Sequence, residues 1–192
     1  MSAEDDLPPD TIATLRIDLL DSDPLIWREV EVPVAMTLKQ LHAVVQAAME
    51  WEDAHLWEFA VGRERIGSSR AAKLTLQAVL RPRTTKLTYI YDFGDCWEHQ
   101  LMLTKPRTAD PDVAYPRYVA GEHPAPPEDC GGIPGFYAQL EILTDPHHPN
   151  HDDAKEWFGD FDPNRFDDQL IKDRLARIAN RRRSASVKSK SR

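Results

Sequence analysis

Hydrophobic and polar residues alternate over two short stretches near the beginning of the chain. Residues 11–20 and 26–32 place aliphatic side chains at alternate positions, which is the spacing of a β-strand with one buried face. The polar cluster Asp21-Ser22-Asp23-Pro24 between them is typical of a turn. The pattern therefore predicts a β-hairpin, and Pro33 marks its end because proline cannot donate a ladder hydrogen bond.

The period changes to that of a helix after this hairpin. Between residues 37 and 49 the apolar positions are spaced three and four apart, so they form one buried stripe. Thr37 precedes the stripe and Gln40 follows three residues later, which is a capping-box pattern. A hairpin followed by such a helix is similar to the start of a β-grasp fold.

The rest of the chain continues to mix the two periods. The pattern predicts a short hairpin through Gly62, a short helix over residues 74–80, two strands over 85–92 and 98–105, and helices over 136–143 and 149–158. Residues 106–127 read as an irregular surface segment, and Asp162-Pro163 as the opening of a last helix. The predicted fold is α+β: a mixed or antiparallel sheet with a β-hairpin–helix start and C-terminal helices packed on it.

Length and charge define the expected domain. The 192 residues suit one domain, which we place at residues 11–180, between a disordered N-terminus (1–10) and a basic disordered tail (181–192). The tail holds six basic residues and no acid, whereas residues 1–180 carry 18 basic and 32 acidic side chains, a charge of −14. Such a body repels nucleic acid unless its basic groups cluster. The tail is either a weak nucleic-acid contact or a solvated end.

Cysteine usage and hydropathy indicate the compartment. The two cysteines, Cys96 and Cys130, form no CxxC pair and no disulfide scaffold, which is typical of a reducing compartment. The first ten residues show no signal-peptide pattern, and no apolar run approaches the roughly 18 residues that span a membrane. We therefore expect a cytoplasmic location and no membrane partner.

The first candidate for chemistry is the segment Asp92-Phe93-Gly94-Asp95-Cys96-Trp97-Glu98-His99. Two carboxylates three residues apart, around a glycine, can ligate a hard cation. They can equally cap a tight turn by accepting hydrogen bonds from backbone amides. The Asp-Phe-Gly triplet also occurs in kinases, but no glycine-rich loop or His-Arg-Asp segment accompanies it here, so a kinase is excluded.

Histidines and a second acidic pair extend the candidate list. His42, His55 and His99 can converge on a metal, or each can bond separately to the backbone, because their spacing matches no local metal motif. Glu128-Asp129 lies between two prolines and two glycines, in a segment that we expect to dock onto the first hairpin. The acids disfavour a reactive thiol at Cys130. The histidines at 147, 148 and 151 look like a surface helix start.

Several motifs in order resemble the plasmid pRiA4b ORF-3-like family. They are Pro24-Leu25-Ile26-Trp27-Arg28, Val32-Pro33, Thr37-Leu38 with Leu41-His42 and Gln46, Trp51-Glu52-Asp53-Ala54-His55-Leu56 with Phe59, Tyr89-Ile90-Tyr91-Asp92-Phe93-Gly94-Asp95 with Trp97 and His99, and Gly121 followed by Pro126-Pro127-Glu128-Asp129-Cys130-Gly131-Gly132. The resemblance covers residues 11–175 and departs at Glu50, where the family usually has glycine. It implies an α+β fold and an association with insertion elements, under a resolvase-like name. No serine among arginines supports that name, since Ser22 lies between two aspartates.

The leading hypothesis is a non-enzymatic binding or accessory module with a polar, aromatic-walled cleft and no obligate cofactor. Costly residue types concentrate in the motif segments, which a fold needing only a core does not require. The alternatives are a divalent-metal-dependent hydrolase using the same groups, and weak DNA association through the C-terminal tail. The expected cleft residues are Trp27, His42, His55, Asp92, Asp95, Trp97, His99, Glu128 and Asp129.

Overall fold

The computed structural model describes residues 7–79, 85–104 and 106–190, and side chains as far as residue 185. Within them an antiparallel sheet has the order β4-β3-β5-β6-β1-β2-β8, and β7 pairs with one end of β1. The strands are β1 Thr11–Leu19, β2 Trp27–Pro33, β3 Trp57–Val61, β4 Glu64–Gly67, β5 Lys86–Tyr91, β6 Trp97–Leu103, β7 Arg107–Thr108 and β8 Arg117–Glu122. The helices are α1 Leu38–Met49, α2 Ser68–Ala71, α3 Leu76–Val79, α4 Gly132–Thr144, α5 His151–Phe158 and α6 Gln169–Lys190.

The predicted α+β class is confirmed, including the hairpin–helix start. Three predictions extend beyond the described residues: most of the N-terminal tail (1–6), the ends of the elements predicted to reach Leu80 and Lys105, and the last two residues of the basic tail. No helix of the described residues is long and apolar enough to cross a membrane.

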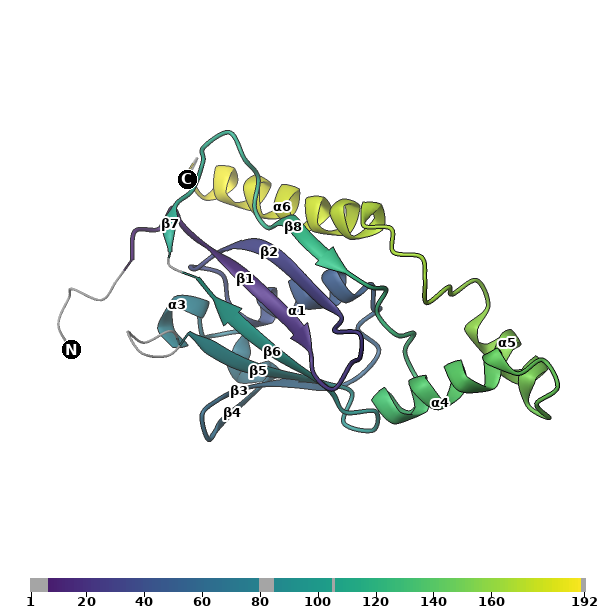
Figure 1. Cartoon of the computed structure of the whole chain (residues 1–192). Coiled ribbons are helices and arrows are strands. Elements are labelled where there is room, and N and C mark those ends of the chain that lie inside the picture. Colours follow the sequence, from purple (N-terminus) through teal and green to yellow (C-terminus); the bar gives the residue numbers. More distant parts are fainter. Residues whose placement is uncertain (1–6, 80–84, 105, 191–192) are drawn as a thin grey trace.

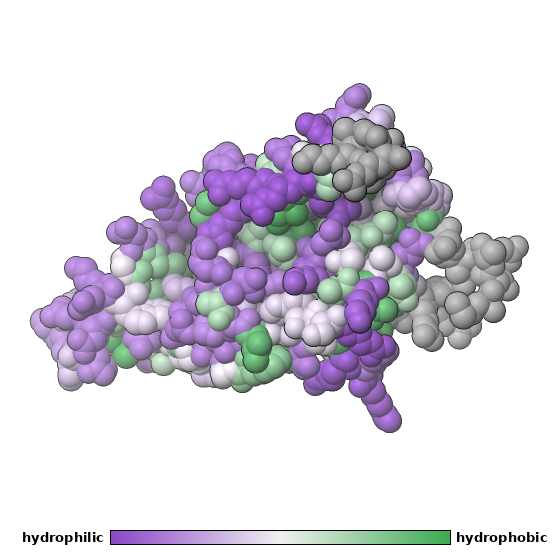
Figure 2. Space-filling model, turned by 180° about the vertical axis from the view of Figure 1, so that it is seen from behind, coloured by the Kyte–Doolittle hydropathy of each residue, from purple (hydrophilic) through white to green (hydrophobic). Residues whose placement is uncertain are grey.

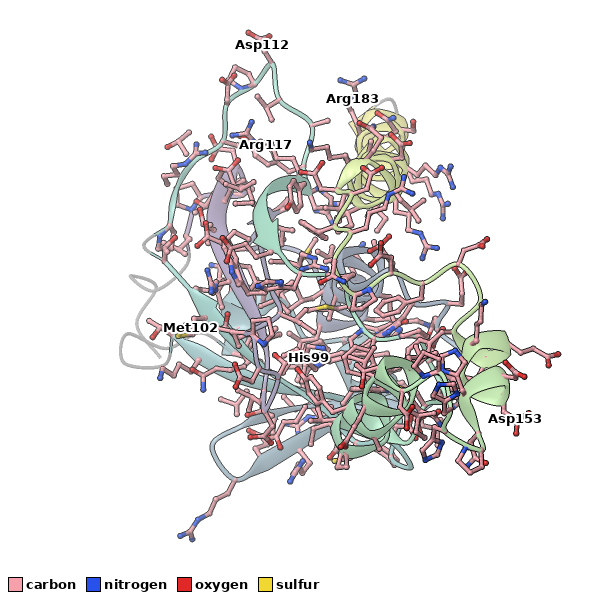
Figure 3. All side chains as sticks on the ribbon, turned by 45° about the vertical axis from the view of Figure 1, so that its right-hand side comes forward. His99, Met102, Asp112, Arg117, Asp153 and Arg183 are labelled. Atoms are coloured by element: carbon pink, nitrogen blue, oxygen red, sulfur yellow. The ribbon has the colours of Figure 1, made fainter. Side chains whose placement is uncertain are left out.

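The alternation in β1 gives the sheet one buried face and one polar face. Leu15, Ile17 and Leu19 are completely buried, while the residues between them are partly exposed. Figure 1 shows α1 behind the sheet and α6 along the β8 side, so the buried face lies toward these helices. In β6 the same alternation places His99 toward the interior and Met102 toward the open face (Figure 3). One covered and one solvated face is the usual arrangement of an antiparallel sheet.

Helix α1 supplies most of the layer that covers the sheet. Thr37 accepts a hydrogen bond from the Gln40 amide, and the Gln40 side chain accepts one from the Thr37 amide, which confirms the capping box. The predicted stripe, including Leu38, Leu41 and Val45, is fully buried. Burying such a side chain contributes about 1.5–3 kcal/mol, so this stripe fixes α1 on the sheet.

The segment predicted as irregular, residues 106–127, contains two strands. Arg107–Thr108 pairs with β1, and Arg117–Glu122 pairs with β2 as an edge strand, with a bulge opposite Glu29 and Val30. The alternation is weak because β8 is partly exposed on both faces. Edge strands need less apolar sequence than central ones, so periodicity alone does not reveal this one.

The last helix begins later than the sequence pattern predicts. Asp162 was expected to be its N-cap, but the carboxylate accepts a hydrogen bond from Asn164 within a turn, and α6 begins at Gln169. An Asp-Pro pair stabilises a turn as readily as a helix start. Helix α6 then continues to Lys190, through most of the segment for which a disordered tail was expected.

A fully buried arginine connects α1 with the edge of the sheet. Arg28 donates from Nε to the Ala48 carbonyl and from Nη1 to the carbonyls of Trp27 and Glu122. Its guanidinium lies 4.4 Å from the centre of the Phe166 ring. Burial lowers the pKa of Arg28 to about 10, so it remains a cation near neutral pH. No carboxylate of the described residues forms an ion pair with it.

Candidate functional site

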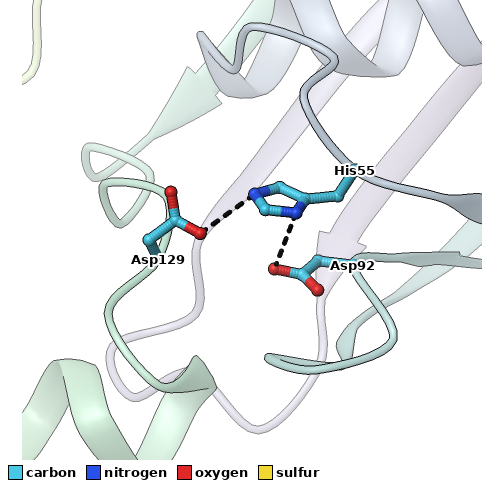
Figure 4. Close-up of side chains that lie close together, drawn as sticks. All are labelled: His55, Asp92 and Asp129. Atoms are coloured by element: carbon cyan, nitrogen blue, oxygen red, sulfur yellow. Dashed lines mark ion pairs between the residues drawn. The ribbon is translucent and has the colours of Figure 1, made fainter.

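Three loops that are distant in sequence meet at one end of the sheet. His55 comes from the α1–β3 loop, Asp92 from the β5–β6 turn and Asp129 from the β8–α4 loop (Figure 4). His55 Nδ1 lies 3.6 Å from Asp92 Oδ2, and His55 Nε2 lies 3.0 Å from Asp129 Oδ1. One ligand atom from each residue lies within 4.8 Å of the others. We call these three residues the junction site.

One ring nitrogen of His55, Nε2, has no hydrogen-bond partner among the described residues. Nε2 is enclosed by protein, yet its contact with Asp129 lacks the geometry of a hydrogen bond, and no other described group bonds to it. A buried ring nitrogen normally has a partner, so such an atom needs an explanation. It can serve as a nitrogen ligand, with the two carboxylates supplying oxygen ligands.

Asp92 caps a turn and also faces the junction site, the two roles that the sequence left open for it. Its Oδ1 accepts a hydrogen bond from the Gly94 amide at 2.9 Å, which caps the β5–β6 turn. Its Oδ2 points to His55 instead. Turn formation therefore uses one carboxylate oxygen and leaves the other for the junction site.

Tyr91 holds two of the three loops together beneath the site. Its hydroxyl accepts hydrogen bonds from the amides of Ala54 and His55 and donates one to Glu128. Burial, together with Glu128, raises the pKa of Tyr91, so the phenol stays protonated and keeps donating. Glu128 also accepts a hydrogen bond from the Glu52 amide, which adds a second connection between the same loops.

Asp95 fixes the third loop from the other side. Its Oδ2 accepts a hydrogen bond from the Gly131 amide at 3.1 Å. Gly132 packs so closely that a Cβ there would lie 2.2 Å from the Asp95 carbonyl oxygen, and its φ is +66°. The β8–α4 loop therefore docks onto the β5–β6 turn and the α1–β3 loop, not onto the first hairpin as the sequence suggested.

Left-handed backbone conformations are concentrated in these loops. Of the seven described non-glycine residues with positive φ, all but Asp21 belong to them: Glu50, Asp53, Asp92, Cys96, His123 and Asp129. Each such conformation costs of order 1 kcal/mol for an L-residue and persists only where surrounding structure enforces it. Such concentrations are typical of binding and catalytic sites.

The other predicted histidines lie outside the junction site. His42 is buried on α1, bonded to Tyr89 and Asp53 and stacked on Trp57 at 4.0 Å. His99 is completely buried on β6, where Nδ1 lies 3.1 Å from the Trp97 carbonyl. Both side chains face the core because they sit at inward positions of α1 and β6.

The two predicted tryptophans are also elsewhere. Trp97 is completely buried in the core. Trp27 lies on the opposite face of the sheet, under the Arg16 guanidinium, with its indole donating to Glu122. Of the nine residues expected to line one cleft, the structure brings together His55, Asp92 and Asp129, supported by Asp95 and Glu128, and separates Trp27, His42, Trp97 and His99 from them.

Trp51 is a site residue that the candidate list missed. Its indole donates to the Pro126 carbonyl at 2.8 Å, and its ring stacks on Tyr91 with 5.1 Å between centres. Together with Glu128 it also lines an adjoining groove of about 450 Å³, whose other walls include Phe158, Phe161 and Phe166. Its place in the motif Trp51-Glu52-Asp53-Ala54-His55 was the available signal, but sequence cannot tell a wall residue from a core residue.

Cys130 does not contribute a reactive thiol. Burial, with the nearby Asp95 and Asp129 carboxylates, raises its pKa to about 12, so the thiolate is scarce at neutral pH. The surface histidines 147, 148 and 151 do not form a metal-compatible group either. Within the described ranges, such a group is found only at His55, Asp92 and Asp129.

A family model for the plasmid pRiA4b ORF-3-like protein matches residues 11–170. The chain belongs to the plasmid pRiA4b ORF-3-like family. It is 33% identical, over 163 residues, to the "Uncharacterized protein y4hQ" of Sinorhizobium fredii, covering 79% of this chain and 83% of that protein. It is also similar to a crystal structure titled as a protein of unknown function, MM3350, from Methanosarcina mazei Go1. That likeness has a TM-score of 0.77 and 36% identity, and covers 82% of this chain and 95% of the other.

The sequence resemblance implied a glycine in place of Glu50, and the structure gives a physical reason why glycine suits this position. Glu50 is the C-cap of α1, with φ of 62° in the left-handed region. Glycine adopts this conformation without the steric cost that a Cβ brings. Glu50 compensates in part through its charge, which acts on buried Arg28, although burial raises the pKa of this carboxyl.

Two substitutions separate these contributions at Glu50. Glu50→Gly and Glu50→Ala both remove the attraction to Arg28, but only alanine keeps a Cβ in the left-handed region. We expect the glycine variant to have the higher free energy of unfolding, by about 1 kcal/mol. Urea denaturation of both variants measures this difference. Equal stabilities would show that the C-cap carries no strain.

Proposed function

We propose that this chain is a binding module whose ligand is a divalent cation, or a molecule held through one, at the junction site. The observation that carries the proposal is the convergence of one imidazole and two carboxylates from three separate loops. A mixed nitrogen and oxygen set of this kind suits Zn²⁺ or Mn²⁺. The network of Tyr91, Asp95 and Glu128 supports it by restraining all three loops.

The adjoining groove supports a role in binding rather than in scaffolding alone. It is walled by aromatic rings and shares Glu128 with the network that restrains the junction site. Its volume of about 450 Å³ lies in the range of small-molecule sites. A cation at the junction site would therefore be next to a cavity with room for an organic ligand.

Calorimetric titration of metal-free protein with Zn²⁺ and, separately, Mn²⁺ tests the proposal. We expect one ion per chain and a rise in melting temperature, because a ligand at a hundred times its Kd stabilises the folded state by about 2.7 kcal/mol. Asp92→Asn and Asp129→Asn should each weaken binding at least about tenfold. The asparagine at position 92 keeps the acceptor for Gly94 and tolerates positive φ, so the turn should survive.

Asp160→Asn provides the matched control. Asp160 is an exposed acid in the adjoining groove but is not part of the junction site, and its replacement changes the net charge equally. Equal weakening by all three variants would indicate diffuse attraction of cations by an acidic protein. Absence of binding would mean that the three side chains only form ion pairs with one another.

A metal-dependent hydrolase is the second candidate, favoured by the small number of protein ligands. Three ligands leave coordination positions open for a water molecule, which a divalent cation activates by lowering its pKa. Hydrolysis of a chromogenic phosphate or carboxylate ester by the metal-loaded protein distinguishes the two functions. Turnover that Asp112→Asn, at an exposed acid outside the adjoining groove, preserves and Asp129→Asn abolishes would establish the enzyme.

A further inference from the structure

Helix α6 is a basic element on an acidic protein. From Arg174 to Lys190 it contains seven basic residues and no acid, whereas residues 1–180 carry a formal charge of −14. Figure 2 shows hydrophilic side chains along the upper edge of the molecule, where α6 lies. Such a concentration of positive charge attracts a polyanion to this helix, whereas the acidic remainder of the surface repels it.

Three of these arginines lie on one face of α6. Arg174, Arg177 and Arg181 are three and four residues apart, which aligns them along the helix over about 10 Å. They line a groove of about 390 Å³ between α1 and α6, together with apolar residues that include Ala43, Ala47, Leu170 and Ile178. Arg183, two residues after Arg181, lies about half a turn further on and points outward from the other side of the helix (Figure 3).

Two of the three guanidinium groups have no partner among the described residues. Arg174 donates to the Trp51 carbonyl and pairs with Glu52, whereas exposed Arg177 and Arg181 form no hydrogen bond or ion pair there. The groove's other acid, Asp53, is bonded to His42. Arg177 and Arg181 are therefore free to bind an anion in the fork geometry that suits phosphate.

The ordinary structural explanation for basic residues late in a helix covers only part of this pattern. Cations stabilise the C-terminal end of a helix through its dipole, but the effect falls off within the last turn. Arg177 and Arg181 lie more than two turns before Lys190. Their position and their lack of partners leave both guanidinium groups available to a ligand.

We propose that this arginine face binds the phosphate backbone of nucleic acid without reading its sequence. A row of three arginines aligned over about 10 Å fits a chain of regularly spaced phosphates better than a compact anion. The residues involved are separate from the junction site. This inference is therefore independent of cation binding, and either can fail without the other.

Binding of a fluorescently labelled 30-base-pair DNA, measured by anisotropy over a range of salt, tests this inference. We expect Arg177→Gln/Arg181→Gln to weaken binding at low salt by about tenfold. The slope of log affinity against log salt should fall by about 2, because each lost phosphate contact removes roughly one unit. Arg177→Lys/Arg181→Lys keeps both charges and should retain most of the affinity and the slope.

The control removes the same charge elsewhere. Arg63→Gln/Arg165→Gln replaces two exposed arginines outside α6 and should leave the slope unchanged. Equal losses in the two glutamine variants would overturn the proposal, as would undetectable DNA binding by the unaltered protein at low salt. Binding of poly-glutamate in place of DNA would assign the face to an acidic peptide instead.

Discussion

Replacing Gly132 by alanine is expected to lower the free energy of unfolding by about 3 kcal/mol. The new Cβ would lie 2.2 Å from the Asp95 carbonyl oxygen, which is backbone and cannot rotate away. The φ of +66° adds the cost of a left-handed L-residue, about 1 kcal/mol. Chemical denaturation measures the loss, and the β8–α4 loop should become more accessible to protease because its docking is what the substitution disrupts.

Gly62→Ala is the matched control for this variant. Gly62 has nearly the same φ, +60°, but no atom lies within 4 Å of its added Cβ. It should therefore lose only the conformational cost, about 1 kcal/mol. If both variants lose the same amount, the close approach of the two loops contributes nothing to stability.

The stability of the protein is expected to fall by about 3 kcal/mol from His99 alone as the pH is lowered from 6.5 to 4. Burial lowers the pKa of His99 to about 4, against 6.5 for a free imidazole. Between these values the unfolded chain binds a proton that the folded protein does not. The free energy of unfolding is therefore unaffected by the titration of His99 above pH 6.5 and falls as the pH is lowered toward 4.

His99→Phe tests this dependence by urea denaturation at several pH values. Phenylalanine keeps a ring against Trp51, whose centre lies 5.3 Å from that of His99. At pH 7 the loss of the bond to the Trp97 carbonyl is offset by removal of the buried, unpaired Nε2, and the variant should lose less stability on acidification than the unaltered protein. Burial also lowers the pKa of His42. His42 and the carboxylates are present in both proteins, so their effects on stability cancel when the two proteins are compared. Leu101→Ala, which truncates a buried side chain that does not titrate, should lower the stability by the same amount at every pH.

Sequence patterns predict the elements whose signals are local. The Thr37–Gln40 capping box and the alternation in β1 each lie within a few residues, and both are confirmed. The edge strand β8 was missed because its burial depends on partners far along the chain. The start of α6 was misplaced because Asp162 has a side chain that stabilises turns and helix caps alike.

In the candidate site, too, the sequence predicts local features but not those that depend on distant parts of the chain. His55, Asp92 and Asp129 were named from residue type, but their grouping results from loop docking across long sequence separations. Trp97 and His99 were assigned to a cleft because such residues are rare and costly. In the structure they fill the core, which a single sequence cannot distinguish from a cleft wall.

The position of β1 inside the sheet, between β6 and β2, has a consequence for how the chain folds. Leu15 pairs with Val30 close by in sequence, but on its other edge with Leu103. The hairpin and α1 can form early, whereas the second edge of β1 stays unpaired until β6 is present. Such long-range pairing slows folding and leaves an exposed edge open to other chains meanwhile. Truncated chains that contain α1 but end before β6 should therefore depend most on chaperones to stay soluble.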